Sequence, residues 1–503
     1  MKTWIKIGLL SLAVAMMACN PEVEDTTDED ETAEQTSGTA GEIEVPTDTV
    51  WNHTVTIVYN GSSATVTVDA DSVTYSVSGG DVTIKSQAKN IQYTASGSGS
   101  GSLKIYSDYR YKLTLNSLTL TSSGKPVINN QGKKSLFLTL DGTSTLSDAS
   151  GYDTENSDKE DQKGAIFSEG QIYILGDGTL NLAGKNKHAL ASDDFIMMQS
   201  GTVNITAAAT DGVHTNDAFQ MDGGTLTITS SDEGICVDEG NLAISGGNIN
   251  IKTSGTSAKG IKSYNAITIS GGVTVVSALG GSGESGSEGI ESKHDITITG
   301  GQVFVESYDD GINAAGQSTG NTLDSAAHIV ISGGYVYAHA LNNDGIDANG
   351  NLVVSGGVVV AISAGGAEVA LDAHEQYKLT VSGGTLFSIG GLESGASLTQ
   401  ACYYTSTWSK TTWYSMTVGD KVYAFKTPSS GGSNLVVSGS AQPTVKSGVT
   451  VSDGTSILNG NAYINATVSN GTNVTLSSYS AGQGGGGGGP GGGGGPGGGG
   501  GWH

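Results

Sequence analysis

Arginine is almost missing from this sequence. Arg110 is the only one among 23 basic residues, which face 49 acidic residues and give a net charge of −26. Guanidinium groups are the usual means of recognising phosphate, and the negative electrostatic field of such a protein repels polyanions. We therefore exclude nucleic acid as a partner.

Cysteine is also scarce, with three residues in 503. Nothing in the sequence pairs Cys236 with Cys402, so we expect two buried free thiols. No segment between residues 50 and 480 has the periodicity of an amphipathic helix. No His/Cys/Asp spacing marks a zinc site or a nucleophilic triad either.

Glycine, in contrast, supplies 78 residues and recurs at spacings of 23 to 33 residues from Gly178 to Gly384. An alternating strand precedes each of these glycines, as at 296–298, and a second strand follows, as at 303–305. A third strand begins at a Gly-Ile pair such as 289–290. Three short strands per repeat predict an all-β fold, a right-handed parallel β-helix whose coils stack about 4.8 Å apart.

Composition divides the chain into six predicted parts. They are a lipoprotein signal peptide (1–19), an acidic disordered tether (20–48), an N-terminal β cap with the first coils (49–150), the parallel β-helix coils (151–400), an aromatic-rich C-terminal cap with the last strands (401–481) and a poly-Gly/Pro tail (482–503). The caps are expected because a solenoid must cover its ends.

The N-terminus has the pattern of a secreted lipoprotein. A charged start is followed by an apolar run over 7–18 that is too short to span a bilayer. The run ends in Met16-Met17-Ala18-Cys19, which resembles a bacterial lipobox and implies a lipid on Cys19. The acidic stretch that follows resembles a surface-export signal. We therefore expect a lipid-anchored protein on the extracellular face of the bacterial envelope, at the outer membrane or cell surface.

Acidic residues gather at the corners beside the Gly-Ile strands. Equivalent residues of successive coils form columns in a β-helix, where stacked carboxylates repel one another and several carboxylate oxygens suit Ca²⁺. We expect calcium ligands among Asp211, Asp217, Glu233, Asp238, Glu288, Glu291, Asp309, Asp310, Asp344 and Asp347. A solvated edge of turn-favouring acids is the alternative.

Two lysines on the same edge are candidates for catalysis. A lyase of the pectate type needs a basic side chain with a lowered pKa to remove the C5 proton of a calcium-bound uronate. Lys262 and Lys293 are the candidates for that base. Ion pairing with acids such as Glu288 and Glu291 is the interpretation that we favour.

Aromatic residues alternate with aliphatic ones in several strands. Tyr335 and Tyr337 flank Val336, while Phe304 and Phe387 occupy the position of Tyr337 in other coils. If Val336 points inward, these rings point outward, where sugars stack on exposed aromatic faces. We expect the four rings to form a stripe that faces a polysaccharide.

Several motifs together resemble a known family. They are Gly178-Thr-Leu-Asn-Leu, Ala189-Leu-Ala-Ser-Asp-Asp-Phe, Thr210-Asp-Gly-Val and the repeated Ile-Thr-Ile-Ser-Gly-Gly and Asp-Gly-Ile. The chain resembles, over about residues 90–480, the bacterial extracellular carbohydrate-binding β-helix family, which is similar in fold to pectate lyases. The resemblance implies an extracellular protein that binds calcium and associates with plant cell-wall glycans such as cellulose or polygalacturonate. It does not imply established catalysis.

Residues and resemblance together predict a cell-surface, calcium-dependent polysaccharide-binding protein rather than an enzyme. A calcium-dependent polysaccharide lyase, or a hydrolase, on the same fold is one alternative. A non-catalytic adhesin or structural surface protein without a sugar ligand is the other. The oligomeric state is left open.

Overall fold

A computed structural model describes residues 40–47, 49–281, 286–319 and 322–481. The chain separates into two units, Met1–Glu34 and Gln35–His503, and the described residues all belong to the second. The predicted signal peptide, the lipidation residue Cys19, residues 20–39 and 48 of the predicted tether and the poly-Gly/Pro tail lie outside the described residues. In the described part of the chain, no helix is long and apolar enough to cross a membrane.

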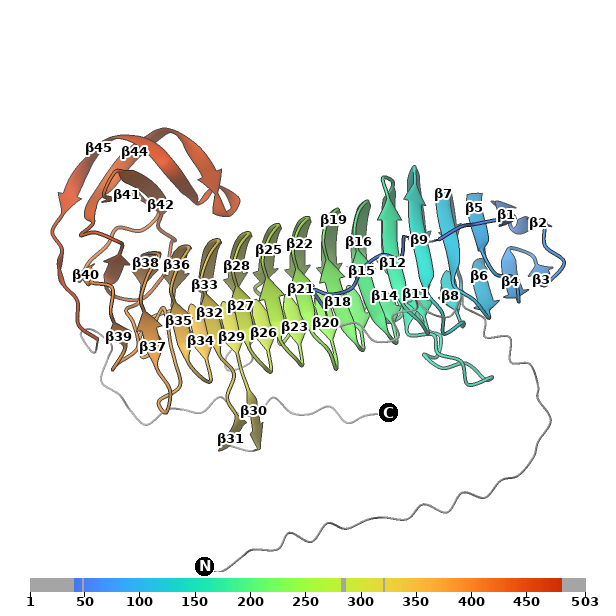
Figure 1. The fold of residues 1–503 in the computed structure, drawn as a ribbon, viewed down its shortest axis with the longest axis horizontal. Coiled ribbons are helices and arrows are strands. Elements are labelled where there is room, and N and C mark those ends of the chain that lie inside the picture. The colour runs from blue at the N-terminus through green and yellow to red at the C-terminus, as the bar shows by residue number, and fades with distance from the viewer. Residues whose placement is uncertain (1–39, 48, 282–285, 320–321, 482–503) are drawn as a thin grey trace, which may run out of the picture. The chain divides into compact units, whose positions relative to one another are not determined.

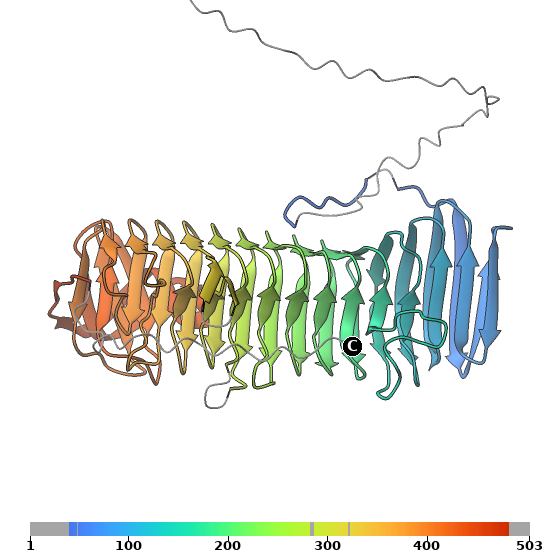
Figure 2. The ribbon, with the colours of Figure 1, turned by 90° about the horizontal axis from the view of Figure 1, so that it is seen from below.

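The structure is a parallel β-helix, as the repeats predict (Figures 1 and 2). Each regular coil places one strand before the glycine pair, one after it, and a third at the Gly-Ile signature. Equivalent strands of successive coils pair in parallel, so the alternating apolar residues of each strand stack in register. Within the described ranges, helix is limited to the 3-10 turn η2 (Leu458–Gly460).

A 28-stranded sheet contains the strands that flank the glycine pairs. It begins with β1 (His53–Gly61), β2 (Ser63–Val68), β5 (Ile91–Ser100) and β7 (Tyr111–Thr121). The strands before the glycines are β9 (Leu136–Asp141), β12 (Ile172–Gly176), β15 (Phe195–Met198), β18 (Ala218–Met221), β21 (Leu242–Ile244), β24 (Ile267–Ile269), β27 (Ile296–Ile298), β32 (Ile329–Ile331), β35 (Leu352–Val354), β37 (Leu379–Val381) and β39 (Ser397–Leu398). The strands after them are β10 (Thr143–Ser147), β13 (Thr179–Gly184), β16 (Thr202–Ala208), β19 (Thr225–Ser230), β22 (Asn248–Thr253), β25 (Val273–Ala278), β28 (Gln302–Ser307), β33 (Tyr335–Ala340), β36 (Val358–Ile362) and β38 (Thr385–Ile389). The sheet also includes β40 (Cys402–Thr405), β43 (Leu435–Ser438) and β46 (Ser477–Ser478).

The third strands form a separate 12-stranded sheet. Its members are β3 (Val73–Ser78), β4 (Asp81–Ser86), β6 (Ser102–Ser107), β8 (Ile128–Asn130), β11 (Gly164–Ser168), β14 (His188–Ser192), β17 (Val213–Thr215), β20 (Ile235–Val237), β23 (Ile261–Ser263), β26 (Ile290–Ser292), β29 (Ile312–Ala314) and β34 (Ile346–Ala348). Ile235, Ile261, Ile290, Ile312 and Ile346 stack inside the coils and are fully buried. This aliphatic stack fixes the register of every side chain on the outer face of the sheet.

Glycine makes the corners of the coils possible. The second residue of the Gly271–Gly272 pair has a φ of +71°, a left-handed conformation that other residues rarely adopt. At the third strand the reason is space, because a Cβ on Gly289 would overlap the carbonyl oxygen of Gly311 in the next coil. The repeated glycines are therefore requirements of the coil.

A small closed barrel follows the coils in the sequence. It consists of β41 (Trp413–Val418), β42 (Lys421–Lys426), β44 (Thr444–Ile457) and β45 (Ala462–Val474). Its apolar residues, including Met416 and Phe425, pack with Val360 and Phe387 on the outer side of β36 and β38 (Figure 1). The longest repeat carries a hairpin of β30 (Gln317–Thr319) and β31 (Thr322–Ser325). Cys236 and Cys402 are free and buried, as predicted.

Candidate functional site

Two columns of mostly polar side chains run along the 12-stranded sheet, and we call them together the polar ladder. The first column lies two residues before the buried aliphatic residue of each third strand, and the second lies one residue after it. The first contains His188, Asp211, Glu233, Lys259, Glu288, Asp310 and Asp344, and the second contains His214, Cys236, Lys262, Glu291, Asn313, Asp347, Asp372 and Glu393. Parallel pairing brings these residues together although they are distant in sequence.

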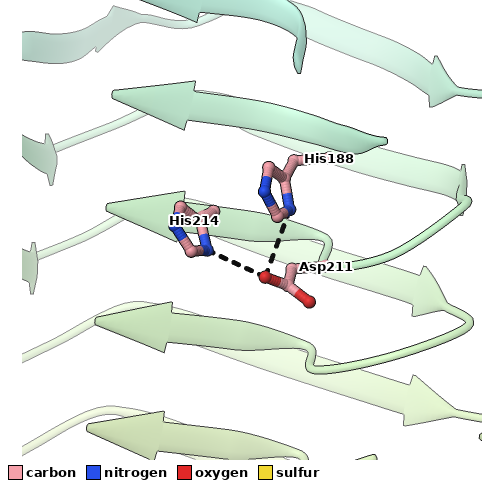
Figure 3. A group of neighbouring side chains, drawn as sticks. All are labelled: His188, Asp211 and His214. Atoms are coloured by element: carbon pink, nitrogen blue, oxygen red, sulfur yellow. Dashed lines mark hydrogen bonds and ion pairs between the residues drawn. The ribbon is translucent and has the colours of Figure 1, made fainter. Parts of the chain in front are cut away.

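The histidine segment of the ladder consists of His188, Asp211, His214, Cys236 and Asp238. Figure 3 shows the first three of these residues. The Nδ1 atoms of His188 and His214 lie 3.1 Å and 2.8 Å from the same Oδ2 of Asp211. The two imidazole rings stack with their centroids 4.1 Å apart. On its other side, His214 places Nε2 3.4 Å from Oδ2 of Asp238, and the thiol of Cys236 donates to the other oxygen of Asp238.

Charges in the histidine segment are balanced inside the protein. Burial alone would raise the pKa of Asp211, but hydrogen bonds from His188 and His214 hold it well below its ordinary value. Burial lowers the pKa of His188 to about 4, so this ring is neutral at pH 7. Burial acts the same way on His214, but Asp211 and Asp238 raise the pKa of His214 to about 9.

The lysine segment occupies the middle of the ladder. Its members are Glu233, Lys259, Lys262, Glu288, Glu291 and Lys293. Lys259 Nζ lies 3.8 Å from Oε1 of Glu288 and 3.6 Å from Oε2 of Glu291. Burial and then Glu291 raise the pKa of Glu288 well above its ordinary value. Burial would also raise the pKa of Glu291, but Lys293 and Lys259 hold it at about 2.

The two candidate bases belong to this ion-pair network. Lys262 Nζ lies 3.4 Å from Oε1 of Glu233, and Lys293 pairs with Glu291. Burial alone would lower the pKa of Lys262, but the charge of Glu233 raises it well above its ordinary value. A general base needs the opposite shift. Lys262 is therefore in the wrong electrostatic environment for the proton-abstracting role, because an acid lies beside it.

The acidic segment lies at the other end and consists of Asp310, Asn313, Asp344, Asp347, Asp372 and Glu393. Carboxylate oxygens of Asp344, Asp347 and Asp372 lie within 4.8 Å of one another. The side-chain amide of Asn313 donates to Oδ2 of Asp310 at 3.2 Å, and Oδ1 of this amide is buried without a hydrogen-bond partner. The backbone N–H of Asp344 donates to Oδ1 of Asp310 at 2.9 Å.

Burial and mutual repulsion dominate the acidic segment. Burial and then Asp347 raise the pKa values of Asp310 and Asp344 well above their ordinary values. Burial and then Asp372 raise the pKa of Asp347 to about 8, and the same residue together with burial raises the pKa of Glu393 to about 8. The side-chain charges that act most strongly on these four carboxyls are all acidic. This segment is therefore short of positive charge.

The predicted calcium ligands thus have different environments. Asp344 and Asp347 lie together with Asp372, which follows Leu371 in the same column as Asp347. Glu288 and Glu291 lie with lysines, and Asp211 and Asp238 lie with imidazoles. Asp217 and Asp309 lie at corners outside the two columns, and burial is the first cause of the raised pKa of each. Column position would have identified His188 and His214, since each occupies a ladder site in its coil.

The predicted aromatic stripe is not open to solvent. The rings of Phe304, Tyr337 and Phe387 point away from the inside of the coils, but they are only 5%, 3% and 1% exposed. Phe387 stacks on Phe425 of the barrel with ring centroids 4.7 Å apart, and Tyr335 is partly buried against the same cluster. The expectation of an exposed stripe is wrong for the three buried rings, because the barrel covers this face.

Comparison with known proteins points to carbohydrate binding over part of the chain. No curated protein matches the chain. Among solved structures, the polysaccharide lyase-like protein from C. thermocellum, determined as a gadolinium derivative, is similar at 23% identity and a TM-score of 0.41. That match covers 45% of this chain and 92% of the other. The family model described as "Carbohydrate-binding domain-containing protein" matches residues 78–321. Over those residues, the chain matches a carbohydrate-binding family, which confirms the resemblance predicted from its repeated motifs.

Proposed function

We propose that this chain is a cell-surface protein that binds plant cell-wall type polysaccharides, such as polygalacturonate or cellulose, in a calcium-dependent way. The acidic segment is the observation that carries the proposal. Its carboxyls are buried next to one another, and the strongest side-chain charges acting on them are acidic. Buried carboxylates without positive partners are unfavourable unless they are protonated or bind a cation.

The residues of the acidic segment fit a calcium ion. Calcium takes six to eight oxygen ligands from carboxylates and amide or backbone carbonyls. Asp344, Asp347 and Asp372 supply three carboxylates whose oxygens lie within 4.8 Å of one another. Asn313 adds a buried amide oxygen without a partner, in the same column as Asp347. These are the residues that would hold the ion, and Asp310 would add negative charge beside it.

A bound cation would also reduce the electrostatic repulsion between an acidic protein and an acidic glycan. The net charge of −26 repels polygalacturonate, whereas a calcium ion at the protein surface attracts uronate carboxylates. On the same face, Lys262 and Lys293 supply positive charge, with side chains 18% and 31% exposed. Tyr264 follows β23 there and is 44% exposed, which makes it a platform for the apolar face of a sugar.

The proposed location is the extracellular face of the bacterial envelope, with a lipid on Cys19 as the membrane anchor. The lipobox resemblance supports this location, although Cys19 lies outside the described residues. A polysaccharide ligand is consistent with it, since such polymers are met outside the cell.

Retention on insoluble glycans tests the proposal. The purified chain is applied to cellulose and to pectate gel, once with calcium and once with chelator. We expect calcium-dependent retention on at least one matrix, and loss of that retention in the double variant Asp344→Asn/Asp347→Asn. Asp71→Asn is the matched control, because Asp71 is an exposed acid outside the ladder. No retention in either condition would contradict binding to these glycans and would favour the structural or adhesin alternative.

A lyase or hydrolase is the second candidate, and one observation favours it. Burial raises the pKa of Glu288, whereas Lys293 and Lys259 lower that of Glu291, so the pKa values of two neighbouring carboxyls are shifted in opposite directions. Paired acids and bases in active sites have this property. Release of unsaturated or reducing sugar from a uronate polymer, lost in Glu291→Gln, would establish activity. Retention without any product would support binding alone.

A further inference from the structure

Two imidazoles converge on one carboxylate at the other end of the ladder. His188 comes from β14, while Asp211 and His214 come from the next coil at β17. One donor atom from each of the three lies within 4.8 Å of the others (Figure 3). We infer that His188, Asp211 and His214 form a binding site for a divalent transition-metal ion of the zinc class, which joins two successive coils.

The donor set determines the class of ion. Two imidazole nitrogens and one carboxylate oxygen are the ligands of many four-coordinate zinc sites, where a water or another side chain completes the set. Calcium prefers an all-oxygen environment with more ligands. The hydroxyl of Thr210 lies 2.9 Å from Nδ1 of His188, so a further oxygen is present beside one of the three donors.

The distances require only a small expansion. Ligand atoms of a tetrahedral zinc site with bonds of about 2.0–2.1 Å are about 3.4 Å from one another. The two nitrogen-to-oxygen distances at Asp211 are 3.1 Å and 2.8 Å. Binding therefore requires these distances to widen by a few tenths of an ångström. It also requires the two stacked rings to turn apart, so that both Nδ1 lone pairs point at one ion.

The second nitrogen of His214 already has the partner that a metal-bound histidine needs. Its Nε2 faces Oδ2 of Asp238 at 3.4 Å, away from the Asp211 side. A carboxylate that accepts from the far nitrogen of a ligating histidine fixes the ring and strengthens the ligand. In this arrangement Asp238 is a positioning residue, and the thiol of Cys236 donates to its other oxygen rather than to the ion.

The surrounding charge favours a cation. Asp211, Asp232 and Glu233 form a second group whose oxygens lie within 4.8 Å of one another. A divalent ion held by Asp211 would lie beside these acids and would clamp the coil of β14 to the coil of β17.

Cobalt provides the test, because Co²⁺ occupies zinc sites and its visible absorption reports coordination number and ligand type. The chain is prepared without a histidine tag and titrated with Co²⁺. We expect one ion per chain with the strong absorption of four-coordinate cobalt, without a thiolate band, and displacement by Zn²⁺ but not by excess Ca²⁺. Weak absorption of six-coordinate cobalt alone, or displacement by calcium, would overturn the inference.

Variants assign the ion to these residues. His188→Gln and His214→Gln should each weaken Co²⁺ binding at least about 30-fold, whereas the control His53→Gln, at an exposed histidine in β1, should leave it unchanged. Asp238→Asn keeps all three ligands and should weaken binding about tenfold, which covers the case that a histidine variant does not fold. Asp347→Asn should leave Co²⁺ binding at the histidine segment unchanged. Failure of the zinc-class inference is therefore distinguishable from failure of the calcium proposal. Equal affinity in His188→Gln and His53→Gln would overturn the assignment.

Discussion

At the end of the ladder near β14, buried acids share their space with two imidazoles, whereas near β34 they share it with other acids. At both ends the third strands pair in parallel and in the same register. The chemical difference lies in the side chains placed in the two columns. The repeating scaffold therefore does not set the chemistry of the ladder, and each coil can change it with one or two residues.

The lysine segment between them is an internal reference. It has acids as deeply buried as those of the acidic segment, but Lys259 and Lys262 lie beside them. A buried acid can be compensated by an internal cation, by hydrogen bonds or by a bound ion. The histidine segment uses the second means, through the imidazoles of His188 and His214 on Asp211. We therefore expect the acidic segment to depend most on a bound ion, and the lysine segment least.

Removal of an internal cation should have the largest effect. Lys259→Met leaves Glu288 and Glu291 with less compensation in a buried site, and breaking such a network costs about 3–5 kcal/mol. Urea unfolding of the variant should show this loss. Lys159→Met is the control, since solvent screens its exposed ion pair with Glu155. Equal stability of the two variants would show that the middle segment does not depend on its lysines.

The acidic segment should respond in the opposite direction. Asp347→Asn removes one of several repelling carboxylates, so the metal-free chain should become about 1–3 kcal/mol more stable. Calcium affinity should fall about 100-fold, because a charged ligand of the proposed site is lost. Calorimetric titration and thermal unfolding with chelator measure the two effects. A less stable metal-free variant with unchanged calcium affinity would contradict the comparison.

A lysine placed in the acidic segment should make its charge balance resemble that of the lysine segment. Asn313 occupies the same column as Lys262, next to Glu291 and Asp347. In Asn313→Lys the new ammonium would replace calcium as the partner of the acids, so calcium affinity should fall at least about tenfold. The melting temperature should lose its dependence on calcium. Asn313→Gln, which adds no charge, should retain that dependence; if both variants lose it, amide geometry rather than charge is responsible.

The sequence predicts the coil well because the coil is built from local and repeated rules. Alternation gives the buried face of each strand, and glycine marks each corner. The prediction that equivalent residues of successive coils form columns also places Asp310, Asp344 and Asp347 on one edge. The histidine segment is different, since His188 and His214 are 26 positions apart and become neighbours only through the exact register of β14 and β17. Residue spacing alone marks no metal site here, whereas the stacking of the coils brings the two imidazoles to one carboxylate.

The aromatic residues show a second limit of sequence reasoning. Alternation correctly predicts that Phe304 and Tyr337 point away from the inside of the coils. It contains no information about what covers them. The barrel strands β41 and β42 lie about 80 or more residues later in the chain and bury this face. Exposure depends on the tertiary structure. Because Tyr264 is exposed and the predicted rings are buried, Tyr264 is the better candidate for stacking on a sugar.

Tyr264 gives the smallest expected effect and connects the ladder to the glycan. Its ring is 44% exposed, and Nζ of Lys262 lies 4.9 Å from the ring centroid. Stacking of one aromatic ring on an apolar partner contributes about 1 kcal/mol, so Tyr264→Ala should weaken glycan retention about fivefold. Calcium affinity should not change, because the ring lies in the lysine segment. Tyr75→Ala is the matched control, since Tyr75 is 49% exposed in β3, outside the ladder. If both variants bind equally well, the glycan does not contact the middle of the ladder, and the acidic segment alone must hold it.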